Sequence, residues 1–433
     1  MSRADGQHPA SHIGADAEIR ELLLPLLSPE PAGPSAESSA VQELSGEQLD
    51  AVLARIVWAR LVEPGDALAG ALIATLGAGE ALDLVAAGEV SPGAVEALRA
   101  AGSLDVSQKE LAGAFKRWRL RLNREATLSD LKRGVATGMR VIAPDGELWP
   151  RALDDLGPHA PLLLWVRGDP TLLSRPSLAI VGARACTGYG SNITAELAQS
   201  VCDAGVTVVS GAAYGIDAVA HRTALAVGAP TIAVLAGGAD IYYPAAHEQL
   251  LDSIAAAGAV CSEMVPGSAP TRWRFLQRNR SIAALSRATL VTEAGVRSGS
   301  LNTAGHAAEL ARDLGAVPGP VTSATSAGCH RLIREYGAAL VTNGVEVREF
   351  LGIDDSALFE LASEDDARQP ALHQRVLDAL PLRGGRDLID VARIAGVDSD
   401  EAQNALAELE LLGSVEARDT AESGERRWSL RRK

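Results

Sequence analysis

The sequence has few aromatic residues, few cysteines and no excess of positive charge, and each shortage excludes a class of protein. Aromatic residues make up 3% of the 433 positions, which argues against a surface built on rows of base-stacking rings. The formal net charge of −15 excludes a uniformly basic nucleic-acid coat. The four cysteines include no CxxC pair, so neither a zinc site nor a disulfide scaffold is indicated, and reduced thiols in a cytoplasmic protein are the simplest interpretation.

Long hydrophobic runs are missing as well. No stretch reaches the roughly 20 apolar residues that a bilayer-spanning helix needs, and the short run Leu22–Leu27 lacks the basic flank of a signal peptide. We therefore expect no membrane association and no targeting segment. What is present is an ordinary globular composition, 47% hydrophobic and 22% charged, in a length that suggests about three domains.

Composition changes along the chain and predicts a tail followed by a helical domain. Residues 1–45 are rich in Ser, Pro, Ala and Glu, which predicts a disordered tail. Residues 46–134 show helical spacing of apolar residues interrupted by Gly and Pro, as in domains of the SAM or helix-hairpin-helix type. One helix is expected from Ser107 to about Glu125. Its basic side indicates a solvated face more readily than a DNA contact.

Residues 135–347 alternate between short apolar runs, Gly-rich loops and helical stretches. The predicted strands are Leu178–Val181, Val206–Ser210, Thr231–Leu235, Ala259–Ser262, Thr289–Glu293, Ala316–Pro318 and Ala339–Thr342. These runs are continuously apolar, which is typical of parallel strands covered on both faces. We predict an α/β fold with an extended Rossmann-like, doubly wound parallel sheet, whose ligands bind at the carboxyl ends of the strands.

The last part of the chain predicts an acidic linker over 348–368 and a winged helix over 369–433. Three helical segments followed by two short strands fit that fold. The third segment, Ser399–Glu410, has four acidic residues and no basic one, so DNA phosphates would repel it. We expect this domain to contact protein, or to touch DNA only through the arginines and the lysine of its last strand and C-terminus.

Two Gly-containing loops at predicted strand ends favour a phosphate ligand. In Gly182–Gly190, Arg184 stands where GxGxxG has its second glycine, and supplies a bidentate phosphate donor beside a helix N-terminus. A structural turn with a surface arginine is the alternative. The second loop runs from Ser210 and Gly211 through Gly215 to the helix that follows.

Asp217 and His221 lie four residues apart on that following helix, so they share one face and are able to bond to each other. Helix capping by Asp217 explains the pair more simply than catalysis does. The sequence has no recognisable nucleophile elbow, no HExxH spacing and no Walker A motif, so NTP hydrolysis is not expected.

Two further segments complete the predicted edge of the sheet. Five arginines and no acidic residue occur in 272–287, a local phosphate footprint in which Trp273 and Phe275 either stack on bases or pack. The alternative is a helix whose arginines snorkel over the core edge. Between Glu293 and Thr303, hydroxyls and backbone N–H groups at a helix start form a candidate anion nest, to which Arg297 adds charge.

Together these segments resemble the DprA/Smf family, the bacterial DNA-processing protein A. The resemblance is dense from Trp149 to Val347. The matching motifs are Ala179-Ile-Val-Gly-Ala-Arg184, Ser210-Gly-Ala-Ala-Tyr-Gly-Ile-Asp217, Ile232-Ala-Val-Leu-Ala-Gly-Gly238 with Tyr243-Pro244, Phe275 to Arg280, Glu293 to Thr303 and Val317-Pro-Gly319.

The resemblance implies a non-enzymatic, cytoplasmic homodimer without cofactor or metal. Such a protein binds single-stranded DNA, protects incoming DNA in natural transformation and loads a RecA-type recombinase. Carried over by motif, the DNA-phosphate site comprises Gly182, Arg184, Ser210, Gly211, Gly215, Arg278, Asn279, Arg280, Ser298, Gly299 and Ser300. Asp217, His221, Glu293, Arg297 and Thr303 would support it, with Asp217 and Glu293 orienting the loops and arginines.

Two other functions stay open. The lysine-decarboxylase-like Rossmann group processes nucleoside monophosphates with a PGGxGTxxE segment, but the corresponding Glu293–Thr303 lacks PGG. A sensor of a small phosphorylated ligand would bind mononucleotides tightly and show no preference for oligonucleotides.

Overall fold

The computed structural model describes residues 17–27, 45–88, 90, 92–100, 106–353, 371–381, 384–419 and 426–431. The chain divides after Ile353 into two compact units, and each is described by itself. In the described part of the chain, no single helix is long and apolar enough to cross a bilayer. The adjoining helices α4 (Ala67–Leu76) and α5 (Ala78–Ala87) meet that length and composition only together, with a bend of 115° between them.

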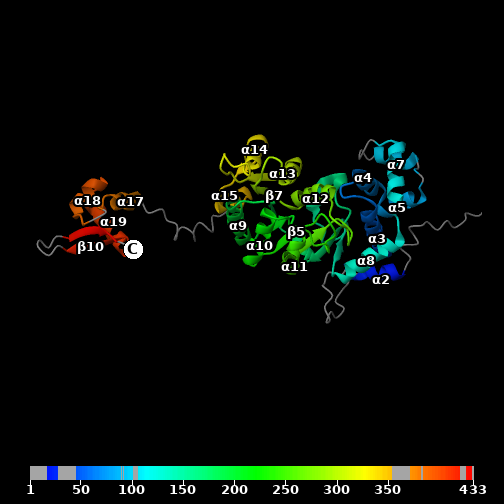
Figure 1. Ribbon diagram of the computed structural model, residues 1–433, viewed down its shortest axis with the longest axis horizontal. Helices are drawn as coiled ribbons and strands as arrows, with labels where there is room; N and C mark the ends of the chain where they lie inside the picture. The colour runs from blue at the N-terminus through cyan, green and yellow to red at the C-terminus, as the bar shows by residue number, and fades with distance from the viewer. Residues whose placement is uncertain are drawn as a thin grey trace, which may run out of the picture. The chain divides into compact units, whose positions relative to one another are not determined.

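A nine-stranded sheet forms the centre of the first unit (Figure 1). Its strands are β1 (Arg140–Ile142), β2 (Leu164–Gly168), β3 (Ser177–Gly182), β4 (Thr207–Ser210), β5 (Thr231–Val234), β6 (Ala259–Ser262), β7 (Ala288–Glu293), β8 (Asp313–Ala316) and β9 (Ala339–Leu340). Their order is β1-β2-β6-β5-β4-β3-β7-β8-β9. The strands from β6 to β9 in this order pair in parallel, whereas β2 pairs antiparallel with both β1 and β6.

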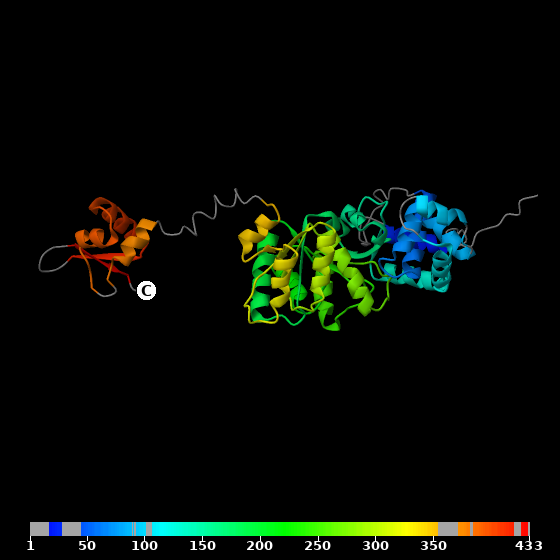
Figure 2. The ribbon, with the colours of Figure 1, turned by 90° about the horizontal axis from the view of Figure 1, so that it is seen from above.

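Helices cover both faces of this sheet, as Figures 1 and 2 show. One face packs against α12 (Arg272–Leu285), α13 (Ser300–Glu309), α14 (Ala327–Glu335) and the 3-10 segment η1 (Arg151–His159). The other packs against α9 (Gly188–Asp203), α10 (Ile216–Ala226), α11 (Glu248–Ala257) and α15 (Gly344–Phe350). Two further 3-10 segments are η2 (Pro170–Ser174) and η3 (Ala245–His247). The central strands are buried from end to end because both faces are covered.

The predicted fold class is confirmed, since the sheet is large, mainly parallel and doubly wound. All seven predicted strands are present, with ends shifted by at most a few residues. The additional strands β1 and β2 were not predicted. They lie at the antiparallel edge of the sheet, outside the strand–loop–helix alternation on which the prediction rested.

The N-terminal helices are α2 (Ala17–Leu27), α3 (Gly46–Leu61), α4 (Ala67–Leu76), α5 (Ala78–Ala87), α6 (Pro92–Ala100), α7 (Gln108–Arg119) and α8 (Arg124–Ala136). Helices α3 to α7 share a core around Trp58, Phe115 and Trp118. Helices α2, α3 and α8 pack on the β1–β2 side of the sheet. Residues 46–134 and 135–347 therefore belong to one compact unit, although the sequence predicted two domains.

Three boundary predictions need correction. The tail predicted over 1–45 contains α2, because Ile19, Leu23 and Leu26 bury an apolar stripe in the core. The single helix predicted from Ser107 to about Glu125 ends at Arg119, and a new helix starts after the N-cap Asn123. The linker predicted to begin at residue 348 overlaps helix α15. The rest of that linker, 354–368, lies outside the described residues.

The second unit contains α17 (Ala371–Asp378), α18 (Leu388–Ala395) and α19 (Ser399–Leu411), followed by the antiparallel pair β10 (Val415–Asp419) and β11 (Arg426–Leu430). Its core includes Val376, Leu406 and Trp428. The acidic residues of α19 are exposed. The predicted secondary structure is present, while the assignment to the winged-helix fold and the protein-contact role stay predictions.

Candidate nucleic-acid interface

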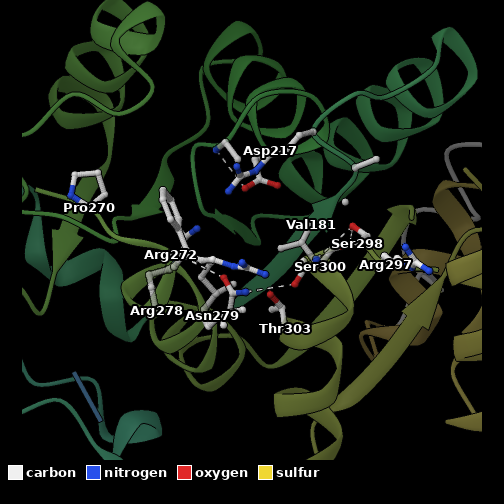
Figure 3. Close-up of a pocket in the computed structure, with 18 of the residues that line it drawn as sticks. Val181, Asp217, Pro270, Arg272, Arg278, Asn279, Arg297, Ser298, Ser300 and Thr303 are labelled. Carbon is white, nitrogen blue, oxygen red and sulfur yellow. Dashed lines mark hydrogen bonds between the residues drawn. The ribbon is translucent and has the colours of Figure 1, made fainter. Parts of the chain in front are cut away.

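The candidate site lies where the strand order of the sheet reverses. The chain passes from β3 through β4 and β5 to β6 in one direction, and then β7 pairs with the other side of β3. Such a switch point leaves a crevice beyond the carboxyl ends of the two strands. Here the crevice contains a cavity of about 840 Å³, lined by the loop after β3, the loop after β7 and one face of α12 (Figure 3).

This cavity brings together most of the predicted site residues. Those that line it are Gly182, Arg184, Asp217, Arg278, Asn279, Arg297, Ser298, Gly299, Ser300 and Thr303. The others, Ser210, Gly211, Gly215, His221, Arg280 and Glu293, do not line it. Figure 3 shows Arg278 and Asn279 on α12 across from Ser298 and Ser300 at the start of α13.

Arg278 is the buried cation of the cavity. Its Nη1 donates to the carbonyl of Gly211 at 2.9 Å and to that of Val234, and its Nε donates to Asn279 Oδ1 at 3.3 Å. Its guanidinium also lies 5.8 Å from the ring centroid of Phe275. Burial lowers the pKa of Arg278 to about 10, with Asp217 opposing the shift, so the group keeps its charge at neutral pH.

Three more arginines surround the cavity, and all of them are exposed. Arg184, Arg272 and Arg297 form no ion pair within the part of the chain that the structure describes. The Arg184 guanidinium lies 5.1 Å from the ring centroid of Phe275, a cation–π contact. Every cation of the lining is thus an arginine, and the sequence has no lysine between Lys132 and Lys433.

The first turn of α13 faces this cluster of arginines. Ser298, Gly299 and Ser300 line the cavity, and Gly299 at the N-cap supplies no side-chain cap. The hydroxyls of Ser298 and Ser300 are 2.7 Å apart. Asn279 Nδ2 reaches across from α12 to the carbonyl of Gly299 at 3.4 Å and to Asn302 Oδ1 at 3.2 Å. A helix start beside four guanidinium groups favours an anionic ligand.

The helix start after β3 differs from the prediction. The loop Gly182–Gly190 was expected to offer free N–H groups to a phosphate, but the carboxylate of Glu293 already lies there. Thr187 donates its N–H to Glu293 Oε2 at 2.8 Å and its hydroxyl to Oε1 at 2.9 Å. A Cβ on Gly190 would lie 2.1 Å from Glu293 Oε2, so the glycine leaves room for this carboxylate. Glu293 thus holds the loop, and its support of a phosphate site stays a prediction.

Asp217 also holds a loop. Its Oδ2 accepts the N–H groups of Gly211 and Ala213 at 3.2 and 3.3 Å. Burial raises the pKa of Asp217, although Arg278 and these N–H groups oppose the rise. The bond considered between Asp217 and His221 is absent among the described contacts. The His221 Nδ1 atom lies instead 2.8 Å from Thr231 Oγ1.

His221 is fully buried, and burial with the nearby charges of His247 and Arg278 lowers its pKa to about 3. It is therefore a neutral core residue at physiological pH. Its Nε2 has no hydrogen-bond partner. The structure places it behind the cavity rather than in it.

The second loop shapes the cavity from behind. Ser210 is buried and donates its hydroxyl to the carbonyl of Ile180 at 2.6 Å, so it does not reach a ligand. A Cβ on Gly211 would lie 2.5 Å from the guanidinium nitrogens of Arg278. Gly215 has φ of +75°, and a Cβ there would lie 2.5 Å from the carbonyl of Arg184. Gly211 thus leaves room for the Arg278 guanidinium, and Gly215 leaves room for the backbone of Ala183 and Arg184.

Arg280 was predicted to extend the basic groove, and this prediction is wrong. Its side chain is 4% exposed and forms a two-pronged ion pair with Glu263, at 2.7 and 2.6 Å. Two residues along a helix are about 200° apart, so Arg278 and Arg280 cannot face the same way. The structure therefore assigns one arginine to the cavity and the other to the opposite side of α12.

The lining also includes residues that the sequence did not place in the site, and two of them bear on its chemistry. Arg272 was counted in the arginine run but not placed in the site, and Tyr243 was noted only as part of a motif. The ring of Tyr243 lies 5.2 Å from that of Phe275, and 45% of the Tyr243 side chain is exposed. The helical spacing of Arg272 from Phe275 and Asn279 was a signal that they share a face. Trp273 is exposed and lies outside the lining.

Known proteins resemble this chain over the same region. A family model described as DNA recombination-mediator protein A matches residues 140–352. The putative DNA processing protein DprA of Mycobacterium tuberculosis is 39% identical over 378 residues, which cover 83% of this chain and 91% of the relative. Protein Smf of Escherichia coli is 36% identical over 287 residues, 64% of this chain and 75% of the relative.

A solved structure agrees. The X-ray structure of DNA processing protein A from Streptococcus pneumoniae aligns with a TM-score of 0.55 and 33% identity, covering 68% of this chain and 95% of that one. The resemblance noted in the sequence is therefore confirmed. The chain belongs to the DprA/Smf family of DNA-processing proteins.

Proposed function

We propose that this chain binds single-stranded DNA in the cavity between the β3 and β7 loops. The observation that carries the proposal is the charge of the lining. Four arginines and the start of α13 line the cavity, and the one acidic side chain of the lining, Asp217, is buried. Phosphates of a polyanion suit this arrangement, and releasing their counterions favours binding.

The shape of the site supports a single strand over a duplex. A crevice of about 840 Å³ accommodates splayed nucleotides but not a double helix. The exposed ring of Tyr243, beside Phe275, provides a face on which an unpaired base stacks. In a duplex the base faces are already stacked on one another, so the Tyr243 ring would gain no such contact.

The family relationship supports the remainder of the proposal. We propose that the protein works as a cytoplasmic homodimer, protects incoming DNA during natural transformation and loads a RecA-type recombinase on it. The description of the matching family as a recombination mediator supports this role. The proposal needs no catalytic step, metal or cofactor.

Binding of labelled oligonucleotides tests the proposed function. Single-stranded DNA should bind more tightly than duplex of the same sequence, and affinity should fall steeply as salt rises. Arg184→Ala should weaken binding by roughly tenfold and reduce the slope of log affinity against log salt by about one. Arg222→Ala is the matched control, because Arg222 is exposed on α10 and outside the lining.

Equal affinity for both forms of DNA, or an unchanged Arg184→Ala variant, would contradict the proposal. Incubation with nucleoside monophosphates separates the alternatives. Free base would indicate the enzyme of the lysine-decarboxylase-like group. Tight mononucleotide binding without oligonucleotide preference would indicate a sensor.

A further inference from the structure

Helix α12 has two polar faces with different partners. Arg272, Phe275, Leu276 and Asn279 recur at spacings of three and four and line the cavity, together with Arg278. On the opposite side of the helix, Arg274, Gln277, Arg280 and Ser281 contact the N-terminal helices, η1 and the end of β6. The contacts on the second face of α12 therefore help to fix the position of the residues that line the cavity.

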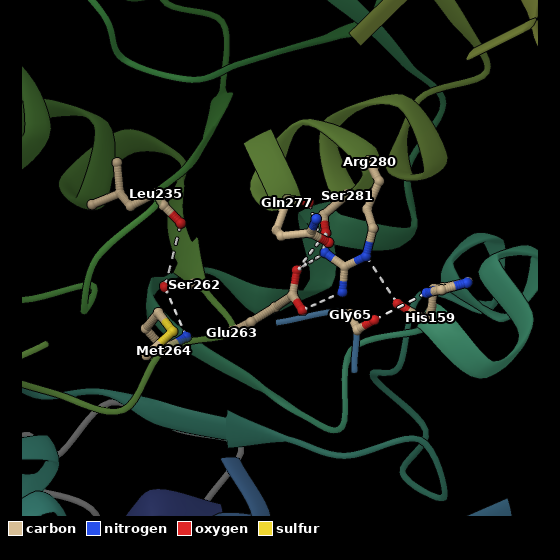
Figure 4. A network of polar contacts seen from close by, with 9 residues as sticks. All are labelled: Gly65, His159, Leu235, Ser262, Glu263, Met264, Gln277, Arg280 and Ser281. Atoms are coloured by element: carbon tan, nitrogen blue, oxygen red, sulfur yellow. Dashed lines mark hydrogen bonds and ion pairs between the residues drawn. The ribbon is translucent and has the colours of Figure 1, made fainter. Parts of the chain in front are cut away.

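The first anchor of this second face is buried. Arg280 donates to both carboxylate oxygens of Glu263 and also to the carbonyl of His159, at 2.9 Å (Figure 4). Ser281 donates its hydroxyl to the same carboxylate at 2.5 Å. His159 Nδ1 in turn lies 2.9 Å from the carbonyl of Gly65. Glu263, η1 and the turn between α3 and α4 thus come together around the Arg280 side chain.

The second anchor lies six residues earlier on α12, about one and two-thirds helical turns away. Arg274 donates from Nε and Nη2 to the two carboxylate oxygens of Glu63, at 2.8 and 3.1 Å. Arg121 pairs with the same carboxylate at 3.1 Å. Burial raises the pKa of Glu63, but hydrogen bonds and charge from Arg274 and Arg121 outweigh that effect and leave the pKa lowered. Glu63 is thus held as an anion between α12 and the turn that follows α7.

The turn between these anchors fits closely against α12. Gly65 has φ of +76°, and a Cβ there would lie 2.6 Å from Gln277 Oε1 and 3.2 Å from Arg280 Nε. No residue of this turn lines the DNA cavity. The contacts of this turn with α12 therefore connect the N-terminal helices to the cavity face of that helix.

We propose that Glu63 and Glu263 are positioning residues for DNA binding: through Arg274 and Arg280 they hold α12 in the register that aims Arg278 and Asn279 into the cavity. This inference rests on the proposed function. The inference predicts a change in DNA affinity whose sign is opposite to the one that charge alone would cause. Removing an acidic charge near a DNA site increases affinity by Coulomb attraction alone. Removing a positioning carboxylate decreases it.

The experiment measures binding of a single-stranded oligonucleotide to the full chain by fluorescence anisotropy. Glu63→Gln and Glu263→Gln should each weaken affinity by about threefold to tenfold, because a loosened helix presents its cavity face less accurately. Glu196→Gln is the control: Glu196 is exposed on α9, so neutralising it should leave affinity unchanged or slightly higher. The double variant Glu63→Gln/Arg274→Gln should bind as weakly as the weaker of its two single variants, since each substitution alone already breaks the Glu63–Arg274 pair.

Tighter or unchanged binding by Glu63→Gln, while the wild type binds normally, would overturn the inference and leave the proposed function intact. No binding by the wild type would overturn the proposed function instead. Thermal unfolding of each variant identifies those that fail to fold. If Glu263→Gln does not fold, Glu63→Gln still decides the test. The Glu63 side chain is 32% exposed and tolerates a polar substitution more readily than that of Glu263.

Discussion

Helices α9 and α13 begin at the same edge of the sheet, after neighbouring strands, yet their N-termini are used in opposite ways. At α9 the N–H and hydroxyl of Thr187 are bound by the protein's own Glu293. At α13 the first turn borders a cavity lined with arginines, its N-cap Gly299 has no side chain, and among the described contacts only the Ser298 hydroxyl accepts the N–H of Ser300, at 3.4 Å. The comparison teaches that a Gly-rich loop before a helix indicates an anion site. It does not indicate whether the anion is a side chain of the protein or a bound ligand. The closed end should affect stability, and the open end should affect ligand binding.

The most stringent test of this contrast adds a methyl group at the start of each helix, α9 and α13. Gly190→Ala places a Cβ 2.1 Å from the Glu293 carboxylate and should destabilise the fold by about 2–3 kcal/mol. Gly299→Ala is the matched control, because no atom lies within 4 Å of its added Cβ and its φ is −63°. Urea unfolding of the full chain measures both. Similar losses in the two variants would contradict the contrast between a closed and an open helix start.

Glu293→Gln tests the closed end with a smaller effect. The amide still accepts one hydrogen bond from Thr187, but the charge at the helix start is lost. Since bonds to a charged acceptor are stronger, the free energy of unfolding should fall by about 1–2 kcal/mol. Oligonucleotide affinity should stay within about threefold, because the carboxylate is outside the cavity lining. A large loss of affinity at unchanged stability would show that Glu293 belongs to the binding site itself.

Ser298→Ala tests the open end and should have the smallest effect. Its hydroxyl lies in the cavity lining, 2.7 Å from that of Ser300. Losing one hydrogen bond to a phosphate should weaken oligonucleotide binding by roughly threefold to tenfold. The free energy of unfolding should fall by less than about 1 kcal/mol, because the backbone hydrogen bond that the hydroxyl accepts, from Ser300 N–H, is long at 3.4 Å. Calorimetry of the variant with and without oligonucleotide separates the two quantities.

The sequence predicted the parallel part of the sheet well, because continuous apolar runs such as Leu178–Val181 have few alternatives to a buried strand. It predicted the cavity at the strand ends for the same reason. It missed α2, whose short apolar stripe is embedded in a tail of Ser, Pro and Glu. The tertiary contacts of Ile19 and Leu23 stabilise this helix, and a local pattern does not contain them.

The site was harder to predict where one residue type serves two purposes. Arg278 and Arg280 read alike in sequence, and only helix geometry separates them onto opposite faces. That argument was available from spacing alone. The partner of Arg280 was not, because Glu263 lies on another strand end and His159 lies in η1, far away in the chain. Glu293 shows the same limit, because its hydrogen-bond partner is the backbone N–H of Thr187, which sequence composition does not reveal.

The exclusive use of arginine around the cavity has a regulatory consequence. A guanidinium group has no amine that an acetyl group can neutralise, and it does not lose its proton near neutral pH. Lysine acylation, a common way to weaken nucleic-acid binding, therefore has no target among the lining residues. Affinity for DNA should be almost insensitive to pH between about 6 and 9 and to amine-directed chemistry. Ionic strength is then the variable to which this surface responds.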